Sequence, residues 1–208
     1  MNTETAIVYV VDDDASFRKS LIRLLTAHGL SAQAYDSASE FLKSGLAARA
    51  GCIVLDVRMP GLSGLDLQAE LARAECAMPV IFLTGHGDIP MSVQAMKKGA
   101  VDFLTKPVDE DNLLMAVRNA LSRNAKHLRE RDEIEAVRAR IQALTERELE
   151  VMKHVIAGEL NKQIGDRLGV VEKTIKVHRV RVMEKMGVPS VAELVRLCAL
   201  AGIEPAEK

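Results

Sequence analysis

The sequence has few aromatic residues and few cysteines, and it has no long apolar run. Trp is absent and aromatic residues make up only 3% of the 208 positions, so aliphatic side chains must fill the cores. Cys52, Cys76 and Cys198 are odd in number and lack ligand spacing, which argues against a disulfide framework or a zinc site. No apolar run approaches the roughly 18 residues of a membrane span, and the first residues lack the basic flank of a signal peptide. These absences predict a soluble cytoplasmic protein.

An excess of charge of one sign is also missing. The chain carries 28 basic and 29 acidic side chains, for a formal net charge of -1. Residues 1–122 hold 11 basic and 15 acidic side chains, whereas residues 145–208 hold 11 and 10. Bulk charge therefore does not indicate a nucleic-acid-binding protein, and any such function must rest on local clustering. The length is sufficient for two ordinary domains.

Short apolar runs in the first half of the chain end in polar, reactive side chains. These runs are residues 7–11 before Asp12 and Asp13, 52–55 before Asp56, 80–83 before Thr84, and 101–105 before Lys106. A weaker run at 31–35 and helical patterns between the runs complete the alternation. Together they predict an α/β fold with a doubly wound, five-stranded parallel sheet of flavodoxin-like order. Because the carboxyl ends of parallel strands share one edge, the carboxylates, the hydroxyl and the amine should meet there.

Asp56 by itself allows three interpretations. It can be a nucleophile, a metal ligand, or only the cap of a turn that leads to Pro60 and Gly61. Neighbouring carboxylates repel one another unless a cation neutralises them, and a hard ion such as Mg²⁺ prefers oxygen ligands. The glycine-rich stretch 85–88 lacks the lysine of a phosphate-binding P-loop, so we expect a mobile loop beside the site, with no chemistry assigned to His86.

The order of these polar side chains, which includes a Lys-Pro pair, resembles the receiver domain of two-component response regulators over residues 5–122. The resemblance implies that Mg²⁺ is bound by Asp13, Asp56 and the backbone carbonyl of Arg58, with Asp12 acting through water. It also implies that Asp56 accepts a phosphoryl group from a sensor histidine kinase.

The same resemblance assigns helper residues and a switch. Lys106 would supply positive charge to the phosphoryl oxygens, and Thr84 would supply a hydrogen bond. Phe103, three residues before Lys106, matches the aromatic switch position, where a ring turns inward when the threonine moves towards the phosphoryl group. The alternative is that Phe103 is an ordinary buried strand residue.

A charged connector follows the predicted receiver domain of residues 1–122. Residues 119–143 contain neither Gly nor Pro and are rich in Arg, Glu and Ala, so the last receiver helix is expected to continue as a helical linker over 123–143. Ile134, Val137, Ile141 and Leu144 repeat at heptad spacing. A single heptad stretch leaves two interpretations open, a solvated linker helix and a dimer seam.

Residues 144–208 predict a small helical domain. Thr145 and Glu148 form a capping box ahead of the first helix, and helices over 161–168 and 172–186 flank a turn at Gly169. Two helices about a glycine turn are typical of a helix-turn-helix. The stretch resembles the LuxR-type motif of the NarL/FixJ family over nearly all of residues 144–203, which implies a tetrahelical DNA-binding domain. The family pairs subunits through its last helix.

The second helix of this pair carries the candidate DNA contacts. Residues 173–181 contain four basic side chains and no acid, as expected of a helix that lies between phosphates in the major groove. The alternative is a merely solvated basic face. Val171, before this helix, cannot cap it as the Ser or Thr common in the family would. The predicted contacts are Lys173, Thr174, Lys176, Val177, Arg179 and Arg181.

The combined prediction is a phosphorylation-dependent transcriptional regulator and not an enzyme. Its expected partners are a sensor histidine kinase, double-stranded promoter DNA and, on phosphorylation, a second copy paired mainly through the receiver domain. One rival class is an aspartyl-phosphate phosphatase of the haloacid dehalogenase type, which would carry a second acid where this chain has Arg58. Another is a protein-interaction switch whose output domain no longer binds DNA.

Overall fold

The computed structural model describes residues 6–45, 50–85 and 89–207, and His86 and its neighbours at 87 and 88 lie outside this range. The chain divides into two compact units, residues 1–128 and 129–208. We call them the sheet unit and the helical unit, and we describe each by itself.

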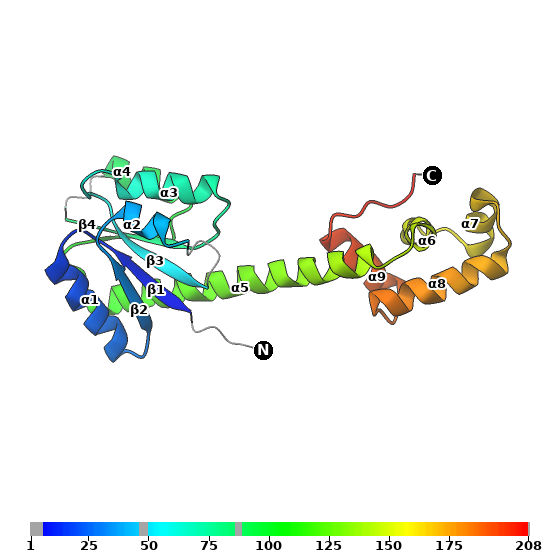
Figure 1. Cartoon of the computed structure of the whole chain (residues 1–208), viewed down its shortest axis with the longest axis horizontal. Coiled ribbons are helices and arrows are strands. Elements are labelled where there is room, and N and C mark those ends of the chain that lie inside the picture. The colour runs from blue at the N-terminus through cyan, green and yellow to red at the C-terminus, as the bar shows by residue number, and fades with distance from the viewer. Residues whose placement is uncertain (1–5, 46–49, 86–88, 208) are drawn as a thin grey trace. The chain divides into compact units, whose positions relative to one another are not determined.

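The sheet unit has a five-stranded, all-parallel sheet in the order β2-β1-β3-β4-β5, which confirms the predicted flavodoxin-like fold (Figure 1). Buried side chains of α2, α3 and α4 pack on one face of the sheet, and those of α1 and α5 pack on the other. The strands are β1 (Ile7–Val11), β2 (Ser31–Tyr35), β3 (Gly51–Asp56), β4 (Val80–Thr84) and β5 (Asp102–Thr105). The helices are α1 (Ala15–Ala27), α2 (Ala38–Lys43), α3 (Gly64–Arg73), α4 (Ile89–Lys97) and the first part of α5 (Glu110–Gln142).

The register of the strands decides which side chains meet at the carboxyl edge. Every residue of β3 is buried, because this central strand is covered by helices on both faces. Asp56, its last residue, pairs with Leu83, so Thr84 lies one position further along β4. Lys106 then follows the end of β5, and its backbone N–H donates to the carbonyl of Thr84 at 2.7 Å. Acid, hydroxyl and amine therefore end at the same edge.

The long helix α5 is one unbroken helix, as the absence of Gly and Pro predicted. Its early residues pack against the sheet, and Asn124 is still buried there, where its side-chain oxygen accepts a hydrogen bond from Gly51 N at 2.9 Å. Further along, Val137 is buried in the core of the helical unit, with Ile141 packed against that core. The heptad row is therefore neither solvated nor free to form a dimer seam at Val137, because its own unit covers it.

The helical unit contains α6 (Glu146–Ile156), α7 (Asn161–Leu168), α8 (Glu172–Met186) and α9 (Val191–Leu200). The predicted capping box is present at the start of α6. Thr145 accepts a hydrogen bond from the N–H of Glu148, whose carboxylate in turn accepts one from the N–H of Thr145. Lys185 Nζ lies 2.6 Å from the same carboxylate, which connects the end of α8 to the start of α6.

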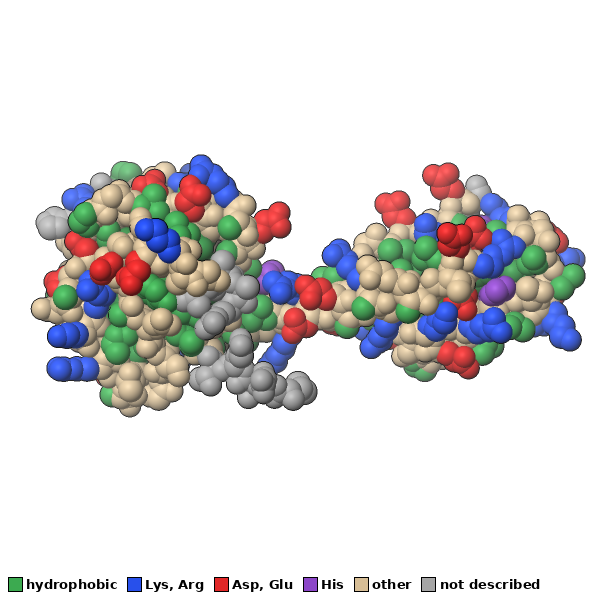
Figure 2. Space-filling model, in the orientation of Figure 1, with side chains coloured by type: hydrophobic (Ala, Val, Ile, Leu, Met, Phe, Trp, Pro, Cys, Tyr) green, Lys and Arg blue, Asp and Glu red, His purple; other side chains and the backbone are tan. Residues whose placement is uncertain are grey.

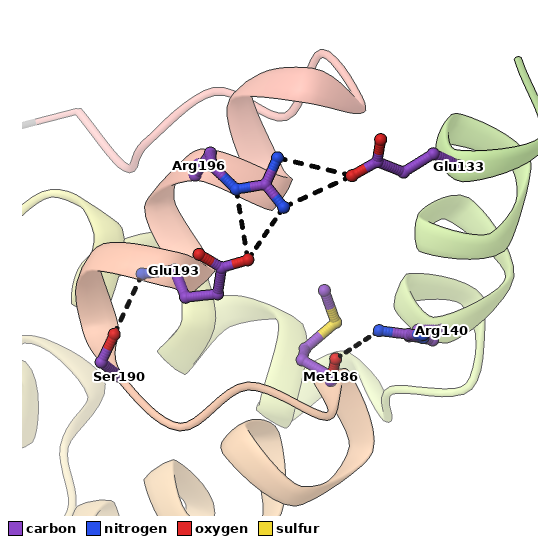
Figure 3. Close-up of polar contacts among 6 residues, drawn as sticks. All are labelled: Glu133, Arg140, Met186, Ser190, Glu193 and Arg196. Carbon is purple, nitrogen blue, oxygen red and sulfur yellow. Dashed lines mark hydrogen bonds and ion pairs between the residues drawn. The ribbon is translucent and has the colours of Figure 1, made fainter. Parts of the chain in front are cut away.

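The last turns of α5 are part of this unit rather than a tether to it (Figure 3). Arg140 donates to the carbonyl of Met186 at the end of α8, at 3.0 Å. Arg196 on α9 bridges Glu193 on its own helix, at 2.8 Å, and Glu133 on α5, at 3.3 Å. Among the described helices, α5 included, none is both long enough and apolar enough to cross a membrane.

Candidate functional site

Three carboxylates meet at the carboxyl edge of the sheet. One oxygen from each of Asp12, Asp13 and Asp56 lies within 4.8 Å of the others. Asp12 and Asp56 are buried and Asp13 is exposed, so the group opens to solvent on one side. Hard divalent ions such as Mg²⁺ take carboxylate oxygens together with waters, and this donor set fits such an ion. Arg58, whose carbonyl was predicted as a further ligand, lies two residues beyond Asp56 with an exposed side chain.

Lys106 reaches into this acidic group. Its Nζ lies 2.5 Å from Asp12 Oδ2 and 3.1 Å from Asp56 Oδ1. Burial lowers the pKa of the ammonium, but the hydrogen bonds and charges of the two carboxylates outweigh burial, so the net shift is upward. Burial raises the pKa of Asp56, and repulsion from Asp12 and Asp13 adds to the rise, while Lys106 opposes it. The site therefore holds a lysine charged and places a carboxylate where negative charge is costly.

Of the other predicted receiver residues, Thr84 lies at this edge of the sheet, whereas Phe103 lies within β5, paired with Phe82. Thr84 is buried at the end of β4. Phe103 on β5 is half-buried, and its ring centre lies 6.1 Å from that of Phe82. The ring thus packs on the face of the sheet covered by α2, α3 and α4, and it keeps one side open.

Two further residues, to which the sequence analysis gave no role in the site, support it. Asp14, the third acid of the run, is the N-cap of α1, and it accepts hydrogen bonds from Ser16 N at 2.8 Å and Phe17 N at 3.1 Å. These bonds hold the pKa of Asp14 below its usual value. Gly64 begins α3, and a Cβ there would lie 2.2 Å from the carbonyl oxygen of Asp56. Only glycine lets α3 approach the end of β3 so closely.

Two glycines allow the tight turn between α7 and α8 in the helix-turn-helix of the helical unit. Gly169 ends α7 in the left-handed conformation, with φ of +66°, as its place in the sequence predicted. Gly165, inside α7, faces the turn, and a Cβ there would lie 2.7 Å from the carbonyl of Val170. This close approach sets how α8 leaves the turn. Val171 at the start of α8 makes no side-chain cap, as expected.

The predicted contacts on α8 differ in exposure. Lys173, Lys176, Val177 and Arg181 are exposed, whereas Thr174 and Arg179 are half-buried. Arg179 donates to the side chain of Asn161 at 3.2 Å and so ties α8 to α7. Lys176 pairs with Glu172 at 3.0 Å on the surface, a contact that is easily exchanged.

The exposed face of α8 also includes Val180, which is 56% exposed but was not among the predicted DNA contacts. At 100° per residue it lies between Lys176 and Arg181, beside Val177. A pair of exposed valines with basic side chains on either side suits a groove that offers methyl groups between two rows of phosphates. Basic and acidic side chains are interspersed over the visible surface of both units, consistent with the near-zero net charge (Figure 2).

Comparison with known proteins gives two family matches that follow the two units. Residues 8–118 match the response regulator receiver domain, and residues 142–198 match the LuxR family of bacterial regulatory proteins. Nodulation protein W of Bradyrhizobium diazoefficiens is 48% identical over 95% of this chain and 87% of its own length. Transcriptional regulatory protein FixJ of Azorhizobium caulinodans is 46% identical over 98% of this chain and 97% of its own.

A solved structure of response regulator StyR is similar along almost the whole chain. It covers 94% of this chain and 98% of its own, with a TM-score of 0.86 and 44% sequence identity. The acidic edge of the sheet, the glycine-closed helix pair and these matches together leave one classification. The chain belongs to the NarL/FixJ family of response regulators, with a receiver domain and a LuxR-type DNA-binding domain.

Proposed function

We propose that Asp56 accepts a phosphoryl group from a sensor histidine kinase. The observation that carries this proposal is the buried Asp56 carboxylate held 3.1 Å from the Lys106 ammonium at an open acidic edge. Asp12, Asp13, Asp56 and the carbonyl of Arg58 would hold Mg²⁺, which supplies positive charge for the phosphoryl oxygens. Lys106 adds a second cation and Thr84 a hydroxyl donor at the same edge, so the negative charge on the incoming group is met from two sides.

The phosphorylation site can be tested with a small phosphoryl donor. Treatment with acetyl phosphate and Mg²⁺ should add one phosphoryl group by mass spectrometry, and Asp56→Asn should abolish the addition. Asp132→Asn, at an exposed acid on α5 in the helical unit, is the matched control and should behave like the wild type. Chelation of Mg²⁺ should stop the reaction. An Asp56→Asn protein that is labelled at the wild-type rate would refute the assignment.

We propose further that α8 binds promoter DNA, in the compartment that holds the chromosome. The exposed basic side chains of Lys173, Lys176 and Arg181, on the second helix of a helix-turn-helix, support this assignment. Lysines and arginines there would contact phosphates, while Val177 and Thr174 would face base edges. Arg179, which was predicted as a direct contact, would act mainly by holding α8 on α7.

DNA binding can be tested by the salt dependence of affinity on genomic promoter fragments. Lys176→Ala or Arg181→Ala should weaken binding and lower the salt slope by about one for each lost phosphate contact. Lys153→Ala on α6, an exposed lysine outside the helix pair, should leave both quantities unchanged. Unaltered affinity in a variant that lacks Lys176, Val177 and Arg181 together would place the DNA surface elsewhere, or would favour a protein-interaction switch.

We also propose that phosphorylation produces a homodimer through the receiver domain. Val93 and Met96 on α4 are each 45% exposed, so this short helix presents two large apolar side chains to solvent. A phosphoryl group at Asp56 adds up to about two negative charges beside Thr84 and Lys106, enough to bias a surface with two conformations. A dimer would place two helix-turn-helix units on one operator and raise affinity without new contacts.

Light scattering distinguishes this dimer from unmasking of α8 by phosphorylation. The unphosphorylated protein should be largely monomeric and the phosphorylated protein dimeric, and Val93→Glu should keep the phosphorylated protein monomeric. An unchanged monomer with raised DNA affinity would instead mean unmasking.

No phosphatase activity is proposed, because the second acid of aspartyl-phosphate phosphatases is replaced by Arg58. Turnover of a phosphomonoester would overturn that assignment.

A further inference from the structure

The Lys106 ammonium has a third neighbour besides the two carboxylates. Its Nζ lies over the ring of Phe17, at 4.3 Å from the ring centre. Asp12 Oδ2 and Asp56 Oδ1 lie at 2.5 Å and 3.1 Å from the same nitrogen. The lysine side chain is only 20% exposed, so most of it is covered by protein. An aromatic face therefore lies against this cation together with the two carboxylates.

Local structure places this ring with some precision. The carboxylate of Asp14 caps α1 and accepts a hydrogen bond from the backbone N–H of Phe17 itself, which fixes the first turn of the helix. The side chain of Arg18 donates to the carbonyl of Asp12 at 2.5 Å, which ties the same turn to the end of β1. Phe17 is half-buried and packs against the core on the α1 and α5 face of the sheet. Phe17 is thus held both by the fixed first turn of α1 and by its packing against the core.

The chemistry of the ring suits a lysine that must meet a phosphoryl group. A cation over an aromatic face is attracted by the quadrupole of the ring, without the use of a hydrogen-bond acceptor. The ammonium has three N–H donors, so two can serve Asp12 and Asp56 while a donor remains for an incoming oxygen. A carboxylate in the place of the ring would also hold the lysine, but it would repel the phosphoryl group. The ring attracts the cation and carries no net charge.

We propose that Phe17 is a positioning residue for Lys106, one that holds the ammonium beside Asp56 through the electrostatics of its π face. The inference rests on the proposed phosphorylation of Asp56, and it adds a residue outside the acidic edge to that reaction. Phe17 acts through Lys106 and does not itself touch the reacting atoms.

The test uses ring fluorination, which withdraws charge from the π face with little change in ring size. Full-length protein with mono-, di- or trifluorophenylalanine at position 17 should accept phosphoryl groups from acetyl phosphate progressively more slowly. The most fluorinated protein should approach Phe17→Leu, which we expect to react about three- to tenfold more slowly than wild type, in line with the usual strength of a cation–π contact. Phe17→Tyr, which keeps an aromatic face, should retain most of the rate.

Phe41 provides the matched control, since it is a buried ring that contacts Tyr9 and Tyr35. The same fluorinated residues at position 41 should leave the phosphorylation rate unchanged. The inference would be overturned if the phosphorylation rate did not change along the fluorination series at position 17, whatever the rate of Phe17→Leu. The ring would then only fill space. If Phe17→Leu fails to fold, the fluorinated series still decides. Absence of label on wild-type Asp56 would instead refute the proposed function.

Discussion

The two units hold their functional charges in opposite ways. At the sheet edge, Asp12 and Asp56 are buried and Lys106 is mostly covered, and each contacts an opposite charge. On α8, the Lys176 side chain is 63% exposed and pairs with Glu172, a neighbour on its own helix. Buried charges interact strongly and have little freedom, which suits selective chemistry on a small group. Exposed charges are individually weak and act by number, which suits a polyanion such as DNA.

The largest effect should follow from removal of the buried cation. Lys106→Ala takes away positive charge from the place where the phosphoryl group would arrive, and it leaves Asp12 and Asp56 to repel each other. We expect phosphorylation by acetyl phosphate to slow by about 100-fold or more, the scale of loss of one preorganised donor. Lys176→Ala should leave this rate unchanged. If Lys106→Ala and Lys176→Ala slowed phosphorylation equally, the contrast between the units would be wrong.

The next largest effect should come from Gly64→Ala. The added Cβ would overlap the carbonyl of Asp56 at 2.2 Å, so either α3 or the backbone at Asp56 and Val57 must move. We expect a loss of about 2–3 kcal/mol in the free energy of unfolding of the sheet unit, as for other overpacked sites, together with slower phosphorylation. Gly85→Ala, where a Cβ would meet nothing within 4 Å, should cost less than about 0.5 kcal/mol in denaturant titrations.

In the helical unit, the ion pair between the buried Glu148 and Lys185 should give an intermediate effect. The hydrogen bond from Lys185, followed by bonds from Thr145, lowers the pKa of Glu148 from 4.5 to about 2. Because the folded-state pKa lies below the unfolded value, this stabilisation is complete above pH 4.5 and is lost as the pH falls towards 2. Hydrogen exchange of helical-unit amides should show that loss, of about 2–3 kcal/mol at most.

Glu148→Gln provides the control for this pH dependence. The variant should be less stable near neutral pH, because the charged hydrogen bond with Lys185 is gone, and its stability should vary less between pH 4.5 and 2. A variant with the same acid sensitivity as the wild type would assign that sensitivity to other carboxylates.

The smallest effects should come from the contacts that join the end of α5 to α8 and α9. Arg140→Ala removes the donor to the carbonyl of Met186 and should cost about 1 kcal/mol of helical-unit stability, typical of one hydrogen bond. Arg196→Ala removes exposed ion pairs and should cost about 0.5 kcal/mol or less. Arg138 is an exposed arginine on α5, and Arg138→Ala should cause no loss of helical-unit stability that hydrogen exchange can measure.

Sequence alone was sufficient where the signal is local. The apolar runs and their polar ends predicted the parallel sheet, and the structure has strands at all of those runs. The capping box of Thr145 and Glu148 and the turn at Gly169 were also correct, because caps and left-handed glycines are specified within a few residues. The order of polar residues along the chain was enough to identify the family, because the residues that follow the strands of a parallel sheet lie side by side at one edge.

Tertiary structure decided what depends on residues far apart in the chain. Lys106 and Asp12 are separated by 94 positions, and no periodicity says that the same ammonium also lies over Phe17. In the sequence, Gly64 looks like an ordinary helix start, and only the structure shows that the carbonyl of Asp56 lies against it. The heptad row with Val137 allowed a solvated helix or a dimer seam, yet it packs into the core of its own unit. Periodicity shows that a face is apolar, but only packing shows what covers that face.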